Sequence, residues 1–161
     1  MTQQTDIQVL NKDLILNLLP KRAQNSHKGT FGHVLNIAGS THYPGAAYLS
    51  SISALRVGAG HCMLASCTDV IDNIASNTCD ITFLDLGQSN YGTIPKDAIK
   101  FVSGAANYNV VSIGPGLNQT GGVSEFVCAF FKKNKDSYTP IVIDADAINI
   151  LPMLRLVKSG Y

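Results

Sequence analysis

Short, almost uninterrupted apolar runs recur along the chain, and they alternate with longer segments whose apolar positions follow helical spacing. Strands that are buried on both faces of a parallel sheet have this continuous apolar character. The runs predict strands at residues 33–39, 61–66, 80–86, 109–113 and 140–144. The intervening segments predict helices at 45–60, 68–77, 95–107 and 121–134, and DAINILPML begins a further helix after the last strand.

This alternation predicts an α/β fold, with an open, mostly parallel sheet and helices on both faces. We see no internal repeat, linker or low-complexity segment, so residues 1–161 are interpreted as a single domain. Before the first strand, Asn11 followed by KDLILNLL predicts a short N-capped helix that ends before Pro20.

Composition narrows the classes of partner. The formal net charge is +1 and charged residues make up 14% of the chain, so neither nucleic acid nor a membrane is expected as a partner. No apolar run approaches the ~20 residues that cross a bilayer. The N-terminal stretch MTQQTDIQVL lacks the basic and apolar regions of a signal peptide, which predicts a cytoplasmic location.

The cysteines and histidines do not predict a metal site. Neither set has ligand spacing such as C-x-x-C or H-E-x-x-H. The cysteines lie in or beside apolar runs, and we expect buried free thiols, as in a reducing compartment. The four are Cys62, Cys67, Cys79 and Cys128.

Unusual residues follow three of the predicted strands. These are Gly39-Ser40, Gly114-Pro115-Gly116 and Asp144-Ala145-Asp146. In open parallel sheets, ligands bind at the carboxyl ends of the strands, where unpaired N–H groups of the following helices bind anions. Gly45-Ala46-Ala47 would let an extended ligand lie against the backbone of the next helix. We therefore predict one ligand site where these segments meet.

Each segment also has a purely structural interpretation. Gly39-Ser40 fits a turn with a helix-capping serine, and Gly114-Pro115-Gly116 fits a rigid turn. Asp146 is placed as a helix N-cap, and Asp144 as a structural hydrogen-bond acceptor. The chain has no G-x-x-x-x-G-K-[ST] loop, and GSTHYPGA is not a G-x-G-x-x-G turn, which disfavours a hydride-transferring dinucleotide enzyme.

Three longer stretches together resemble one known family. They are SHKGTFGHVLNIAGSTHYPGAAYLSSISALRVGAG (26–60), SIGPGLNQT (112–120) and PIVIDADAINIL (140–151). In order and spacing they are similar to the ADP/ATP-dependent NAD(P)H-hydrate dehydratases of the ribokinase-like superfamily. The resemblance runs from about residue 7 to 151. It implies a metabolite-repair lyase of the carbohydrate kinase family, which removes water from hydrated NADH or NADPH.

The resemblance also implies ligands. ADP, or ATP, would act as phosphate donor together with Mg²⁺, and the hydrated (S) form of the reduced cofactor would be the substrate. The expected substrate contacts of this half lie at the GAA helix start and the GPGL loop, and Lys28 and Ser40 would face phosphates. Combined with the strand-end argument, this gives one phosphate candidate, Lys28, and six substrate-binding candidates: Gly39, Ser40, Ala46, Gly114, Gly116 and Asp144, the last at the floor of the cleft.

The chain departs from the family pattern in two places. Asn118 stands where the family usually has glycine, and asparagine tolerates a left-handed backbone, so the turn is expected to survive. The larger departure is that relatives continue to roughly twice this length, through a G-T-G-D-type loop that supplies the aspartate general base. On this resemblance the catalytic residue lies outside the 161 residues, and none is assigned here.

Four interpretations of this difference stay open: an incomplete product or piece of a longer chain, a chain that works with a second polypeptide, a binding module, or a remnant. A parallel sheet that stops midway would expose an apolar edge. We therefore expect either a homo-oligomer or a complementing C-terminal half. The alternative functions are a ribokinase-like small-molecule kinase and a non-catalytic nucleotide-binding module.

Overall fold

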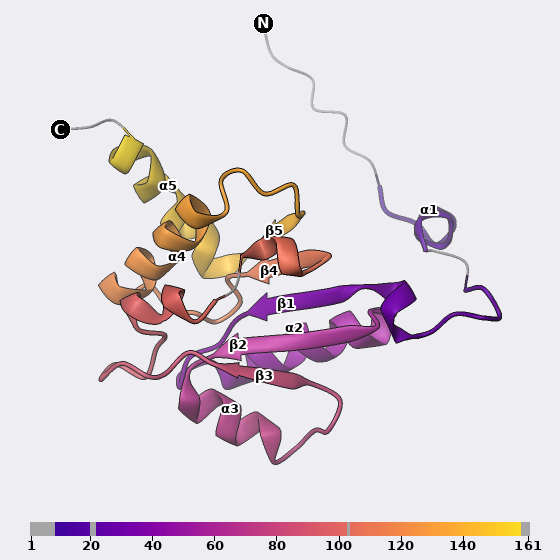
Figure 1. The fold of residues 1–161 in the computed structure, drawn as a ribbon, viewed down its shortest axis with the longest axis horizontal. Coiled ribbons are helices and arrows are strands. Elements are labelled where there is room, and N and C mark those ends of the chain that lie inside the picture. Colours follow the sequence, from indigo (N-terminus) through magenta and orange to yellow (C-terminus); the bar gives the residue numbers. More distant parts are fainter. Residues whose placement is uncertain (1–8, 20–21, 103, 159–161) are drawn as a thin grey trace, which may run out of the picture.

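The computed structural model describes residues 9–19, 22–102 and 104–158. Within these residues, five strands alternate with helices (Figure 1). The strands are β1 (His33–Ile37), β2 (His61–Ser66), β3 (Thr82–Asp85), β4 (Val110–Ile113) and β5 (Ile141–Ile143). The α-helices are α1 (Lys12–Leu18), α2 (Pro44–Val57), α3 (Thr68–Ala75), α4 (Gly121–Lys133) and α5 (Ala145–Lys158), and the 3₁₀ helices are η1 (Lys28–Phe31), η2 (Lys96–Lys100) and η3 (Ala105–Asn107).

All five strands are parallel, in the order β3-β2-β1-β4-β5. The chain therefore begins the sheet at its centre, moves outward through β2 to β3, and returns to the other side of β1. Right-handed crossovers in opposite directions place helices on opposite faces. In agreement, α2 packs on β1, β2 and α3, whereas α4 packs with η2 and α5. The expected open α/β sheet with helices on both faces is confirmed.

A polar contact anchors α2 to the central strand. The side-chain amide of Asn36 on β1 donates to the hydroxyl oxygens of Ser50 and Ser51, at 2.7 and 2.9 Å. The even-numbered side chains of β1 therefore face α2, and its odd-numbered side chains, Leu35 and Ile37, face the other core layer, both fully buried. Small hydroxyl residues on α2 thus accept from the side-chain N–H groups of Asn36, which would be costly to bury without a partner.

The predicted strands agree with the structure, but one predicted helix is wrong. Residues 95–107 form two short 3₁₀ helices, η2 and η3, instead of one α-helix. Gly104 adopts an extended conformation immediately before η3 (φ −57°, ψ 149°), which ends any continuous helix there. The N-capped helix after Asn11 is confirmed, since the Asn11 side chain accepts from the Leu14 N–H at 2.9 Å.

The structure also bears on the predictions about membrane association and about the cysteines. Within the described part of the chain, no helix is both long and apolar enough to cross a membrane. All four cysteines are free, as predicted, but not all of them are buried. Cys62 and Cys67 are buried and Cys128 is half-buried, whereas Cys79 is exposed in the loop before β3.

Candidate functional site

The three glycine- and aspartate-bearing segments meet at the carboxyl ends of the strands. The Gly39 N–H donates to the Pro115 carbonyl at 2.8 Å, which ties the loop after β1 to the loop after β4. The Asp144 N–H donates to the Ile113 carbonyl at 3.1 Å, which joins the end of β5 to the end of β4. The expected juxtaposition at one rim of the sheet is confirmed. The roles of these residues toward a ligand stay predictions.

The glycines of the GPG loop are needed for contacts within the protein. Gly114 and Gly116 both have positive φ, 132° and 67°. A Cβ on Gly116 would lie 2.8 Å from the Cβ of Ala46 and 2.9 Å from that of Tyr43, and one on Gly114 would collide with the Asp144 carbonyl. The missing side chains thus let the loop pack against the start of α2 and the end of β5. Close approach of a ligand is not required to explain them.

Backbone strain is concentrated at the same rim. Among the described residues, Asn118 (φ 71°) and Ala145 (φ 44°) are the two non-glycine residues with positive φ. The tolerance predicted for Asn118 is confirmed. Strained backbone of this kind gathers at functional sites, where the surrounding structure holds it in place. Ala145 carried no sequence signal of this conformation.

Ser40 occupies an unusual position at the entry to α2. It is fully buried, and its hydroxyl oxygen has no hydrogen-bond partner within the described structure. Its carbonyl accepts from the N–H of Tyr43, the N-cap residue of α2, at 2.9 Å. The Tyr43 side chain does not cap the helix. A buried hydroxyl beside an uncapped helix start is a suitable place for a polar ligand group.

A groove with a volume of about 860 Å³ runs along this rim. Loops after β1, β3 and β4 line it, and its charged lining residue is Asp69, at the start of α3. None of the lining residues that the structure describes is a lysine or arginine. The remaining lining side chains include His42, Gln88, Asn90, Tyr91, Asn118 and Thr120. This lining suits hydroxyl, amide and aromatic ligand groups better than a phosphate.

The loop after β3 was missed by sequence reasoning. Its residues 88–92 form one wall of the groove, held by a hydrogen bond from the Thr41 N–H to the Gly92 carbonyl at 2.9 Å. The Gln88 side-chain amide donates to the Asp69 carboxylate at 2.6 Å and accepts from the Asp69 N–H at 3.0 Å. The signal was the polar run GQSN directly after a predicted strand, which the strand-end rule covers as well.

Lys28 does not lie at this rim. It belongs to η1, which precedes β1, so it lies at the amino edge of the sheet, beside His61 at the start of β2. Burial lowers the pKa of His61, with smaller contributions from His33 and Lys28. The expectation that Lys28 lies with Ser40 is wrong, because a residue before a strand and a residue after it are separated by the strand's length.

The two aspartates of the last segment also differ from expectation. Asp144 is exposed and does not form the floor of a cleft. The Asp146 carboxylate does not serve as the predicted N-cap: it accepts from the Asn118 N–H at 2.8 Å and from the Gln119 side chain at 2.9 Å. Asp146 therefore holds the GPGL loop against α5, and this contact fixes the strained turn at Asn118.

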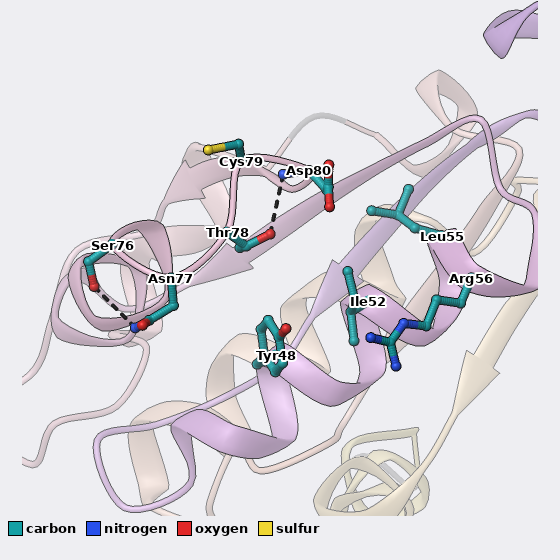
Figure 2. Close-up of a pocket in the computed structure, with 9 residues that line it drawn as sticks. All are labelled: Tyr48, Ile52, Leu55, Arg56, Ser76, Asn77, Thr78, Cys79 and Asp80. Carbon is teal, nitrogen blue, oxygen red and sulfur yellow. Dashed lines mark hydrogen bonds between the residues drawn. The ribbon is translucent and has the colours of Figure 1, made fainter.

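A second hollow, of about 720 Å³, lies between α2 and the segment that joins α3 to β3 (Figure 2). It is lined by Tyr48, Ile52, Leu55, Arg56, Ser76, Asn77, Thr78, Cys79 and Asp80. The residues from 76 to 80 precede β3, so this hollow reaches the amino edge of the sheet, away from the strand-end rim. It contains none of the candidate residues from the sequence.

The described residues contain no group of three or more His, Cys, Asp or Glu side chains that could hold a metal ion. The carboxylates at the rim, Asp69, Asp144 and Asp146, are therefore not gathered into a cluster of that kind. Asp69 and Asp146 are already engaged in hydrogen bonds with neighbouring side chains or backbone.

A family model described as NAD(P)H-hydrate dehydratase matches residues 34–158, from the second residue of β1 to the end of α5. This chain belongs to the NAD(P)H-hydrate dehydratase family. The membership confirms the resemblance that its sequence motifs indicated. The match includes the whole strand-end rim, so the rim is part of the family's domain.

Individual relatives point to the same family. The bifunctional NAD(P)H-hydrate repair enzyme Nnr of Moorella thermoacetica is 31% identical over 160 residues, which are 99% of this chain and 30% of that protein. The solved structure of the ADP/ATP-dependent NAD(P)H-hydrate dehydratase from Bacillus subtilis, co-crystallized with ATP/Mg²⁺, matches with a TM-score of 0.67 at 30% identity and covers 89% of this chain. A ribokinase-like superfamily protein from Enterococcus faecalis shares the fold, with a TM-score of 0.72 at 19% identity and 89% of this chain covered.

This member of the NAD(P)H-hydrate dehydratase family spans less than half the length of its relatives. It covers from 24% to 47% of the curated relatives, and 47% of both the Bacillus and the Enterococcus structures. The described sheet is thus a part of the family's full domain.

Proposed function

We propose that this chain is part of an enzyme that repairs hydrated NADH or NADPH, by removing the added water with ADP as phosphate donor. The observation that supports it best is the meeting of the 39–46, 114–118 and 144–147 segments at one rim, in a chain of the NAD(P)H-hydrate dehydratase family. Further curated relatives are likewise named as hydrate repair enzymes or (S)-NAD(P)H-hydrate dehydratases, which disfavours a small-molecule kinase.

The role proposed for this part is to bind the hydrated cofactor. The groove is lined by amides, hydroxyls and Tyr91, groups that match the carboxamide, ribose and ring of a nicotinamide nucleoside. The buried Ser40 hydroxyl supplies an unused donor and acceptor at the start of α2. The other substrate-binding residues proposed are those predicted at the rim, none of which is among the lining residues of the groove: Gly39, Ser40, Ala46, Gly114, Gly116 and Asp144.

ADP, or ATP, is proposed as the second ligand, because the Bacillus subtilis relative is named as ADP/ATP-dependent and was co-crystallized with ATP/Mg²⁺. The described part of this chain does not fit a metal site of its own, since it has no cluster of three suitable ligands. We therefore derive no step through Mg²⁺. The groove also has no described cationic lining residue, which supports binding of the nucleotide phosphates outside it.

The 161-residue chain alone is proposed to bind the hydrated cofactor with little turnover. The family's aspartate base is expected outside this stretch, and general acid–base catalysis contributes roughly 10²–10⁴-fold to such reactions. A nucleotide-binding module without catalysis is the related alternative. Binding and turnover must therefore be measured separately.

The test is a titration of isotope-labelled protein with hydrated NADPH, followed by amide NMR. We expect shifts at Gly39, Gly114 and Gly116. Gly116→Ala, whose Cβ would push the loop from Ala46, is expected to weaken binding by about tenfold or more. The matched control is Gly104→Ala, because the nearest atom to its Cβ is 3.8 Å away. Shifts confined to residues away from the rim would contradict the proposal.

Turnover is followed in a second assay, by the recovery of intact NADPH absorbance after ADP is added. Recovery would indicate that the chain is catalytically competent. Binding without recovery is the result expected for the chain alone, and activity would then require the rest of the family domain.

We further propose a cytoplasmic location. The supporting observation is that all four cysteines are free, as is usual where thiols are kept reduced. Fractionation of the source cells, with antibody detection of the protein, tests this location.

A further inference from the structure

The hollow between α2 and the segment that joins α3 to β3 lies apart from the strand-end rim. Its volume of about 720 Å³ is in the range of pockets that bind small molecules. Residues 76–80 form one wall, and α2 forms the other. The α2 residues follow the spacing of a single helix face: Tyr48, Ile52, Leu55 and Arg56. The proposed function uses none of these residues, so this hollow is a separate feature of the molecule.

The part of the hollow that lies toward the core is apolar. Ile52 is 8% exposed, and Tyr48 and Leu55 are partly buried against the same core. Arg56, one turn after Ile52 on the same helix face, is exposed. A ligand can therefore bury an apolar body against Ile52 and Tyr48 and still reach a cationic group.

Opposite charges stand on the two walls. Arg56 belongs to α2, and Asp80 belongs to the segment before β3 (Figure 2). Within the part of the chain that the structure describes, neither side chain forms an ion pair, either with the other or with a third residue. The ion pairs found there are Lys96–Glu125, Lys100–Asp97 and Lys135–Asp136. Both charges are thus available to a ligand that lies between the walls.

The segment that carries Asp80 is held by its own side chains. The Asn77 side-chain amide donates to the Asn73 carbonyl at 2.7 Å and to the Ser76 hydroxyl at 3.1 Å. The Asp80 N–H donates to the Thr78 hydroxyl oxygen at 3.2 Å (Figure 2). A wall that is ordered before binding loses less conformational entropy when a ligand binds. The hydrogen bonds therefore favour binding at Asp80.

We propose that this hollow binds a small zwitterion with an apolar body, either an apolar amino acid or a short apolar peptide. The ligand carboxylate pairs with the Arg56 guanidinium, whose forked N–H donors match a carboxylate. The ligand ammonium pairs with Asp80, and the apolar side chain lies against Ile52. Arg56 alone would accept any anion, but the carboxylate on the opposite wall repels ligands that carry only negative charge, such as phosphates.

The test is a titration of the isotope-labelled 161-residue chain with L-phenylalanine and with L-leucyl-L-leucine, followed by amide NMR. The two probes distinguish a free amino acid, whose charges share one carbon atom, from a peptide, whose charges lie farther apart. We expect saturable shifts with at least one probe, at residues 76–80 and 52–56. Blocking either charge of that probe, by N-acetylation or by amidation of its carboxylate, should weaken binding about tenfold, because a charged hydrogen bond is lost.

Variants of the protein test the same two contacts. Arg56→Gln and Asp80→Asn each remove one charge and should each weaken binding about tenfold. Both side chains are exposed, so the fold is expected to tolerate these changes. The matched controls are Lys132→Gln on α4 and Asp72→Asn on α3, which remove exposed charges outside the hollow. The controls should leave the affinity unchanged.

Three results would overturn the proposal. Neither probe could give saturable shifts at the two walls, or a probe with one charge blocked could bind as well as the zwitterion. In the third, the control variants could weaken binding as much as Arg56→Gln and Asp80→Asn. Neither probe is the hydrated cofactor, and the hollow lies away from the rim, so the outcome does not depend on the proposed activity.

Discussion

The two halves of one sheet face differ although their backbone geometry is the same. β2 and β5 are both parallel strands, and Leu64 and Val142 point to the same side. Leu64 is fully buried under α2, whereas Val142 is 55% exposed. The sequence of β5, Ile141-Val142-Ile143, is nevertheless apolar at every position. A strand whose composition suits burial on both faces is therefore covered on only one of them by the described residues.

The largest expected effect comes from truncating the covered side. Leu64→Ala removes buried methyl groups beneath α2 and should lower the free energy of unfolding by about 2–5 kcal/mol. Val142→Ala on the uncovered side should change it by no more than about 0.5 kcal/mol. Urea unfolding followed by circular dichroism measures both. Equal losses would mean that Val142 is already covered in solution.

A smaller loss of stability is expected at Gly114, where the loop after β4 meets the end of β5. Gly114→Ala would bring a Cβ against the Asp144 carbonyl and strain a backbone with φ 132°. We expect a loss of about 1–3 kcal/mol in the free energy of unfolding, together with weaker association of β5 with β4. The same urea measurement suffices, with Gly104→Ala as the near-neutral comparison. A neutral Gly114→Ala would indicate that the end of β5 moves freely.

The smallest expected effect concerns the reactivity of the thiols, not the stability of the fold. Burial beneath α2 raises the pKa of Cys62 to about 11, against a smaller opposing effect of its hydrogen bond with Ser51. At pH 8 only about one thiol in a thousand is then ionised, because each pH unit below the pKa lowers the thiolate fraction about tenfold.

Iodoacetamide labelling with mass spectrometry tests this expectation. The exposed Cys79 should react first, and Cys62 only when the protein unfolds. In Cys79→Ser the fast phase should disappear. Rapid labelling of Cys62 in native protein at pH 8 would show that α2 opens readily.

The sheet and its rim could be predicted because they depend on local signals. Continuous apolar runs mark buried parallel strands, and glycine or aspartate after a strand marks its carboxyl end. The same reasoning failed for Lys28, which was grouped with Ser40 by a motif although a whole strand separates the two. It also failed for residues 95–107, where an amphipathic pattern persisted through a break at Gly104.

Other features depend on tertiary contacts that periodicity does not encode. The positive φ of Ala145 and the contact of Asp146 with the Asn118 N–H arise only when α5 meets the GPGL loop. The exposure of Val142 was likewise invisible, because an apolar strand residue has the same pattern whether or not a helix covers it. The sequence analysis predicted an exposed sheet edge, but it did not indicate which face of the sheet would be left uncovered.

The central position of β1 has a consequence for assembly. β1 and β2, which are made early in synthesis, can pair and be covered by α2 before any later strand exists. Each later strand of the described sheet lies on a flank of this pair, and β5, the last of them in sequence, forms one edge. A further segment could therefore pair with β5 without displacing any strand of the described sheet.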